Sequence, residues 1–120
     1  MPQTNLPIAA VMIHVSDVAA GLNWYQKAFP EARRQTIAEF DFDYLDYQGI
    51  MIELVVADEK VSSGAAGSVV YWQTTNFQKR LDALLGLGAQ LYRGPMLIDN
   101  GMTMCQVKDP WGNCIGLRGT

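Results

Sequence analysis

Two side chains of this sequence are suited to acid–base chemistry. His14 is the only histidine of the chain, and Glu53 lies within the apolar segment IMIELVV. An imidazole and a carboxylate that meet in one pocket can move a proton to and from a reacting molecule. We therefore take Glu53 and His14 as the candidate catalytic residues, with Glu53 as the general base. The alternative is structural, with His14 as a hydrogen-bonded group and Glu53 as the partner of His14 or Arg118.

A larger set of residues is suited to binding an organic molecule. Thioethers adapt to irregular ligands, aromatic rings stack on flat ones, and a few polar groups fix the orientation. Cys114 could also act as a nucleophile. The alternative is that it is an inert free thiol that only packs against its neighbours. The predicted ligand-binding residues are His14, Met12, Met51, Glu53, Tyr71, Gln73, Met102, Met104, Gln106, Cys114 and Arg118.

These residues share one face of the expected strands. Side chains alternate between the two faces of a strand, so residues of equal parity lie together. In four strand-like segments one parity is apolar and suits packing under helices, as with Ile52 and Leu54 or Val70 and Trp72. The other parity mixes polar, small and flexible side chains. We expect this mixed face to line a concave cup.

The segment Asp109-Pro110-Trp111-Gly112-Asn113 fixes the register of one hairpin. A three-residue loop that ends in a left-handed glycine pairs the residues at 109 and 113. Counting back places Cys105 opposite Leu117, Gln106 opposite Gly116 and Met104 opposite Arg118. Cys105 and Cys114 then lie on different faces, so we expect no disulfide between them.

Helix signals place the elements around these strands. Ser16-Asp17 is expected to cap a first helix that Pro30 stops, and Thr74 or Thr75 to cap a second helix. Arg33 and Arg34 are interpreted as solvent-exposed residues at the point where the chain leaves the first helix. Asp41, Asp43 and Asp46 alternate with aromatic residues, which favours a solvated edge strand over a metal site.

The chain contains one structural unit written twice. A strand, a helical stretch and further strands run over about residues 8–57 and again over about 68–118, and residues 58–67 are rich in small residues typical of a linker. The expected fold class is α+β, with two tandem βαβββ modules whose curled mixed sheet forms the cup. The whole chain, 1–120, is expected to be a single domain.

Composition excludes several classes of function. The chain has 120 residues, 49% of them hydrophobic, and a net charge of −3 without a basic cluster, which argues against nucleic-acid binding. No stretch is long and apolar enough to span a membrane, and the first residues lack the pattern of a signal peptide. We expect a cytoplasmic protein.

Three segments resemble the vicinal oxygen chelate superfamily, which includes glyoxalases, extradiol dioxygenases and bleomycin-resistance proteins. They are VSDVAAGLNWYQKAF, IMIELVV and VKDPWGNCIGL, in this order and across nearly the whole chain. The resemblance implies the same cupped βαβββ repeat. It also implies a homodimer, because relatives of this size usually pair.

The resemblance further implies a divalent metal held by four side chains, usually His or Glu. Carried over by spacing, these positions fall on Ala10, Glu53, Val69 (or Ser68 after a slip of one residue) and Gly116. Alanine, valine and glycine have no donor for a metal. His14 could replace at most one ligand, so we expect no metal and no other cofactor.

The leading interpretation is a metal-independent protein of the bleomycin-resistance type that binds a small, partly aromatic drug or metabolite. One alternative is a glyoxalase-like lyase or isomerase with Glu53 as general base. Another is a non-enzymatic scaffold with an empty cup. Whether the protein is an enzyme stays open at this point, because fold in this superfamily says little about chemistry.

Overall fold

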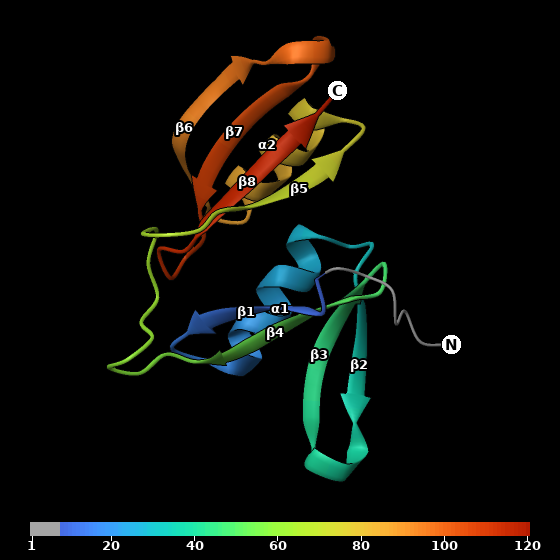
Figure 1. The fold of residues 1–120 in the computed structure, drawn as a ribbon, viewed down its shortest axis with the longest axis vertical. Helices are drawn as coiled ribbons and strands as arrows, with labels where there is room; N and C mark the ends of the chain where they lie inside the picture. The colour runs from blue at the N-terminus through green and yellow to red at the C-terminus, as the bar shows by residue number, and fades with distance from the viewer. Residues whose placement is uncertain (1–7) are drawn as a thin grey trace. The chain divides into compact units, whose positions relative to one another are not determined.

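The chain divides into two structural units, residues 1–62 and 63–120, and the computed structural model describes residues 8–120. Each unit has the order strand, helix and three strands, with a short 3-10 turn between two of the strands (Figure 1).

The first unit forms a four-stranded sheet with one helix. Its strand order is β1-β4-β3-β2, with β1 parallel to β4 and the other neighbours antiparallel. The elements are β1 (Ala10–Val15), α1 (Val18–Ala28), β2 (Arg33–Ile37), η1 (Ala38–Phe40), β3 (Phe42–Tyr47) and β4 (Ile50–Val56).

The second unit repeats this topology. Its strand order is β5-β8-β7-β6, again with the first and last strands parallel. The elements are β5 (Val70–Thr74), α2 (Phe77–Gly86), β6 (Gln90–Leu97), η2 (Asp99–Gly101), β7 (Thr103–Lys108) and β8 (Cys114–Gly119). The expected α+β class with two βαβββ modules is confirmed as two mixed sheets, neither of which closes.

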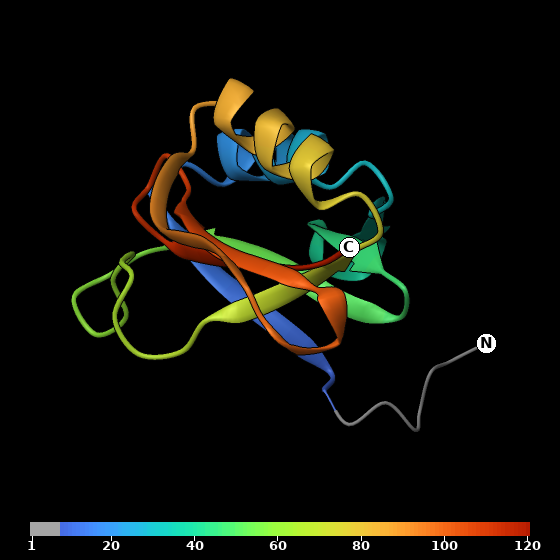
Figure 2. The same ribbon diagram turned by 90° about the horizontal axis from the view of Figure 1, so that it is seen from above.

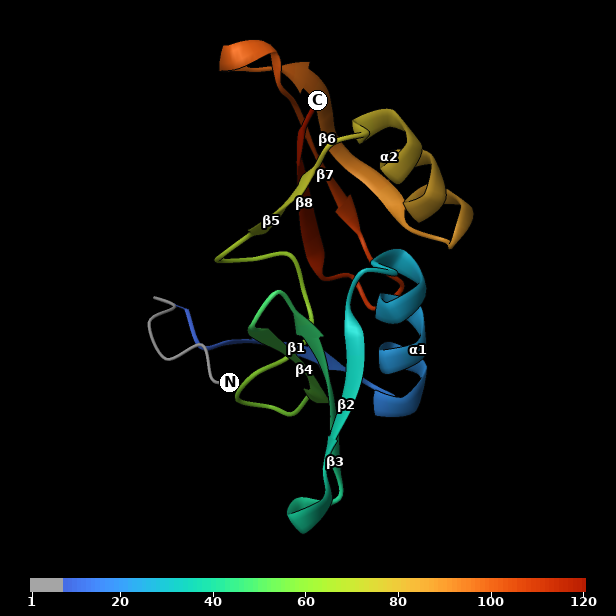
Figure 3. The same ribbon diagram turned by 90° about the vertical axis from the view of Figure 1, so that its right-hand side faces the viewer.

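Each helix covers one face of the sheet in its own unit (Figure 3). The parity that was expected to face the helix supplies the core: Val15, Leu54 and Leu117 are fully buried, and Trp72 is 6% exposed. α1 approaches its sheet closely at Gly21, where an added Cβ would lie 3.1 Å from Cγ2 of Val15. We call the sheet face opposite the helix the open face of that unit; Figure 2 shows α2 on one side of the second sheet only.

The helix caps follow local side-chain chemistry. The Asp17 carboxylate accepts a hydrogen bond from the amide of Ala20 at 3.1 Å, and α1 ends before Pro30, both as expected. The prediction that Thr74 or Thr75 caps α2 is wrong. Asn76 is the cap, because its side chain accepts from the amide of Lys79 at 3.3 Å, whereas Thr74 still belongs to β5.

Two expectations for β2 and β3 are also corrected. Arg33 and Arg34 begin β2 instead of ending the preceding helix, and β3 is an inner strand between β2 and β4. Asp46 closes the following turn, since its Oδ1 accepts from the amide of Gly49 at 2.8 Å. Gln48 and Gly49 both have positive φ, as a tight hairpin turn requires.

The β7–β8 hairpin has the predicted register. The Asp109 amide donates to the Asn113 carbonyl at 2.9 Å, and Gly112 has φ +87°. As a result Cys105 pairs with Leu117, Gln106 with Gly116 and Met104 with Arg118. Both cysteines are free, and Cys105 is buried on the helix side.

The Asp109 carboxylate holds this hairpin together. Although Asp109 is only 4% exposed, its Oδ1 accepts from the amides of Trp111 at 2.8 Å and Asn113 at 2.9 Å. Oδ2 accepts from the side chain of Asn113 at 3.1 Å, and Asn113 in turn accepts from the amide of Gly64 at 2.9 Å. The turn therefore also fastens the start of the second unit to its last hairpin.

Candidate functional site on the second sheet

The open face of the second sheet brings together six of the predicted ligand-binding residues. The strand register places Tyr71 beside Gly116 and Gln73 beside Arg118, in line with Gln106 and Met104 on β7. Met102 directly precedes β7 and is half-buried. The six are Tyr71, Gln73, Met104, Gln106, Cys114 and Arg118.

A chain of hydrogen bonds runs across this face. The side-chain amide of Gln106 donates to the Tyr71 hydroxyl at 2.8 Å. Its carbonyl oxygen accepts a weak bond from the Cys114 thiol at 3.6 Å. Because both ends of the amide are engaged, the Gln106 side chain is held in one orientation and fixes the position of the Tyr71 ring.

The Tyr71 ring lies directly over Gly116. A Cβ added at Gly116 would be 2.5 Å from Cδ1 and 2.7 Å from Cε1 of Tyr71, closer than real contacts allow. Glycine is therefore required at 116 for steric reasons, since the ring occupies the place of a side chain.

Arg118 lies against the ring of Tyr71. Its guanidinium carbon is 4.6 Å from the centroid of the Tyr71 ring, a cation–π contact. Its Nε is buried and has no hydrogen-bond acceptor among the described residues. A buried donor without an acceptor costs about 1–3 kcal/mol. Arg118 is thus held in place with an unused hydrogen-bond donor.

Burial raises the pKa of the Cys114 thiol. The positive charges of Lys108 and Arg93 oppose this shift and the charge of Asp109 adds to it, but desolvation is the largest cause. A raised pKa leaves little thiolate near neutral pH. The structure therefore favours the hydrogen-bonding role of Cys114 over the nucleophilic one.

The other predicted site residues lie on the open face of the first sheet. Met12 pairs with Glu53 and His14 with Val55, so His14 and Glu53 are diagonal neighbours on adjacent parallel strands. Met51 lies two residues before Glu53 on the same face. Met12 is 54% exposed, whereas the others are half-buried. An acid–base pair of His14 and Glu53 stays a prediction.

The four positions implied by the resemblance do not fit a metal. Ala10 and Val69 have no donor atom, and the space beside Gly116 is filled by the ring of Tyr71. Within residues 8–120, no three His, Cys, Asp or Glu side chains come together in a way that could hold an ion. Glu53 is the single donor of the set, and one carboxylate does not make a catalytic metal site.

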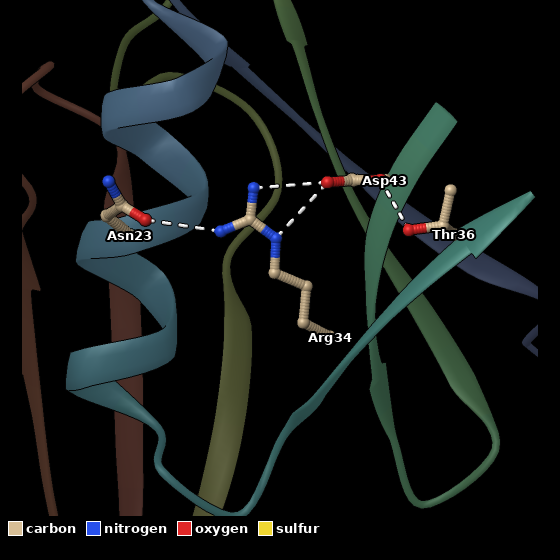
Figure 4. Close-up of polar contacts among 4 residues, drawn as sticks. All are labelled: Asn23, Arg34, Thr36 and Asp43. Atoms are coloured by element: carbon tan, nitrogen blue, oxygen red, sulfur yellow. Dashed lines mark hydrogen bonds and ion pairs between the residues drawn. The ribbon is translucent and has the colours of Figure 1, made fainter. Parts of the chain in front are cut away.

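Arg34 and Asp43 form a polar network outside the predicted site (Figure 4). Arg34 bonds through Nε and one Nη to Oδ2 of Asp43, at 3.3 and 3.1 Å, and through the other Nη to Asn23 of α1 at 3.2 Å. The Thr36 hydroxyl donates to Oδ1 of Asp43 at 2.7 Å. The network joins α1 to the β2–β3 hairpin and explains Asp43 as a structural residue.

This network gives a testable pH dependence. The hydrogen bond from Thr36, followed by Arg34, lowers the pKa of Asp43. A lowered pKa means that Asp43 stabilises the fold above its ordinary range, and that this contribution is lost as the pH falls through the lowered value. In a carbon-13 NMR titration, Thr36→Val and Arg34→Gln should each raise the pKa of Asp43. Thr75→Val, in the second unit, should leave it unchanged, and an equal response to all three would contradict the assignment.

Three residues of the candidate site were missed by the sequence reasoning. Arg93 and Met96 of β6 pair with Gln106 and Met104, and Lys108 pairs with Cys114, so all three lie on the same open face. Parity counting fails in β6 because its register shifts twice between Leu91 and Met96. Lys108 could have been found, since it follows Gln106 by two residues.

A pocket in the first unit, of about 350 Å³, lies beside the β3–β4 turn and is lined by Glu31, Arg33, Asp46 and Gln48. Its walls are charged or amide side chains. Apolar and aromatic side chains, which line most pockets for organic molecules, do not contribute to it. The open face of the second sheet is therefore the better candidate site.

Comparison with known proteins supports the fold. No protein-family model and no curated protein matches the sequence. Among solved structures, a glyoxalase/bleomycin resistance protein/dioxygenase superfamily member from Sphaerobacter thermophilus DSM 20745 has a TM-score of 0.76 at 16% identity over 98% of this chain and 99% of that one.

Two further structures give the same result. A glyoxalase/bleomycin resistance protein/dioxygenase family enzyme from Burkholderia phytofirmans PsJN has a TM-score of 0.73 at 19% identity, covering 92% of this chain and 96% of that one. TioX from Micromonospora sp. ML1 has a TM-score of 0.68 at 15% identity, covering 95% and 98%. The chain has the glyoxalase/bleomycin-resistance fold, as the resemblance to the vicinal oxygen chelate superfamily implied.

Structural similarity at this level of sequence identity establishes the fold, whereas the chemistry has to be argued from the site.

None of the helices within residues 8–120 is long and apolar enough to cross a membrane.

Proposed function

We propose that this protein binds a small, partly aromatic molecule on the open face of the second sheet, without a metal, in the manner of bleomycin-resistance proteins. The observation that carries the proposal is the stacked pair of Tyr71 and Arg118. Gln106 holds the Tyr71 hydroxyl by a hydrogen bond, and the buried Nε of Arg118 has no acceptor among the described residues. A ring and a guanidinium that are held against each other form a preformed surface for a flat group beside them.

The side chains around the pair support binding rather than catalysis. Met104 and Met96 supply flexible apolar contact, and Gln73 and Gln106 supply hydrogen-bonding groups. The raised pKa of the Cys114 thiol argues against a reactive nucleophile on this face. Sequestration needs only affinity, which such a lining can provide.

The proposal predicts ligand binding that depends on the Tyr71 ring. In a screen of aromatic metabolites and antibiotics against EDTA-treated protein, at least one compound should raise the melting temperature and shift the NMR signals of Gln106 and Gly116. Tyr71→Ala should abolish the effect. Phe40→Ala, which removes an aromatic ring that is 72% exposed in the first unit, is the matched control and should retain it.

Other results of the screen would replace the proposal. If no compound binds, the scaffold alternative stands. If binding requires a stoichiometric metal, metal independence is wrong. If a compound is converted, and Glu53→Gln stops conversion while binding persists, the protein is a glyoxalase-like lyase or isomerase; the shared face of Glu53 and His14 is the observation that favours this candidate.

The proposal includes a homodimer in the cytoplasm. Edge strand β6 is exposed along all eight residues and carries Leu91, Tyr92, Met96 and Leu97, which are 44–76% exposed. Exposed apolar side chains gathered on one strand are suited to contact with a second chain. Light scattering of the protein used in the screen measures the mass of the assembly.

A further inference from the structure

We infer that the molecule bound on the second sheet is a flat organic acid whose carboxylate is received by Arg118. This inference rests on the proposed function and narrows it from an organic molecule to an aromatic anion.

The two units differ in charge although their fold is the same. Residues 1–62 contain four basic and nine acidic residues, a net charge of −5, whereas residues 63–120 contain five basic and three acidic residues, a net charge of +2. An acidic protein thus contains one basic half. The candidate site lies on that half.

Three of the five basic residues of the second unit lie on the open face. Arg93, Lys108 and Arg118 come from β6, β7 and β8, and the strand register places all three on the open face. Arg93 and Lys108 both act electrostatically on the thiol of Cys114, which begins β8 and pairs with Lys108 in this face. Three positive charges around one patch favour an anion over a neutral molecule.

The acidic residues of the second unit do not neutralise this patch. The Asp109 carboxylate is turned into the hairpin, where it accepts three hydrogen bonds. Asp82 accepts from Gln78 on α2 at 2.9 Å, and Asp99 lies in η2, between β6 and β7. None of the described carboxylates forms an ion pair with Arg118.

Arg118 has the geometry to bind a carboxylate. Its Nε is buried without an acceptor, and the terminal guanidinium nitrogens form a planar fork that matches the two oxygens of a carboxylate. The cation–π contact with Tyr71 keeps this fork from rotating. The Tyr71 hydroxyl accepts from Gln106 and retains its own proton for donation to the same anion. The flat part of the acid can then contact the thioethers of Met104 and Met96.

The test compares 2-naphthoate with its neutral isostere 2-naphthamide by titration calorimetry at low salt. In wild-type protein the acid should bind about tenfold or more tightly, because only the acid brings a negative charge to the guanidinium of Arg118. Arg118→Gln should remove the preference, and Arg118→Lys should keep only part of it, since lysine lacks the fork. Arg80→Gln removes the same charge from α2 and should leave the preference intact.

A second readout comes from the Nε–H signal of Arg118 in the NMR spectrum. Titration with 2-naphthoate should move this signal, and titration with 2-naphthamide should not. Equal affinity of wild-type protein for both compounds would overturn the anion inference and leave the proposed binding function standing. Absence of binding by both, with no shift at Gly116 or Gln106, would overturn the inference and count against the binding function as well. The comparison of the two compounds in wild-type protein tests the inference even if a variant fails to fold.

Discussion

Replacing Asp109 with alanine is expected to lower the free energy of unfolding by about 3 kcal/mol. The carboxylate accepts two backbone amide bonds and one side-chain bond, and it is 4% exposed. Without it, the amides of Trp111 and Asn113 lose their acceptor in a place that water reaches poorly, at a cost of about 1–3 kcal/mol for each unsatisfied donor. Urea unfolding followed by circular dichroism measures the change.

Asp58→Ala is the matched control for this substitution. Oδ1 of Asp58 also accepts two backbone amides, from Lys60 at 3.0 Å and Val61 at 2.8 Å, but the residue is exposed. Water can replace an exposed acceptor, so we expect a loss below about 1 kcal/mol. Asp109→Asn keeps one oxygen acceptor and should fall between the two. Equal losses at positions 58 and 109 would show that burial of the hairpin carboxylate does not matter.

The same hairpin explains why so much of the second unit could be predicted from sequence. A turn with a left-handed glycine at a fixed place determines the register, and the register then determines which side chains share a face. The pairs of Cys105 with Leu117 and Gln106 with Gly116 follow from Gly112 alone. Alternation of apolar residues along β4 and β8 was equally informative, because one face of each sheet is buried under a helix.

Prediction failed where local geometry departs from simple alternation. The shifts in β6 hid Arg93 and Met96, which are both on the candidate face. Contacts between strands far apart in sequence, such as the cation–π contact of Arg118 with Tyr71, depend on side-chain conformations that alternation does not contain. The capping residue of α2 was misplaced by one or two positions because Thr74, Thr75 and Asn76 are all good caps.

The repeat makes the difference between the two units informative. Met12 pairs with Glu53 in the first unit at the place where Tyr71 pairs with Gly116 in the second. The carboxylate of Glu53 in the first unit thus corresponds to Gly116 in the second, where the Tyr71 ring covers the backbone. In the second unit the glycine and the ring work as a pair, because neither could be changed to an ordinary side chain without moving the other.

A double-mutant cycle tests this pairing. Gly116→Ala places a methyl group 2.5 Å from the Tyr71 ring, so the ring must move and give up its hydrogen bond with Gln106. We expect a loss of about 2–3 kcal/mol in the free energy of unfolding, in the range found for overpacked sites. In a Tyr71→Ala background the same substitution should cost about zero, because the ring is absent and alanine is better suited than glycine to a strand. The resulting coupling energy of about 2 kcal/mol is measured by urea unfolding of the four proteins. If the two costs simply add, the ring does not rest on Gly116, and the preformed surface on which the binding proposal depends is not there.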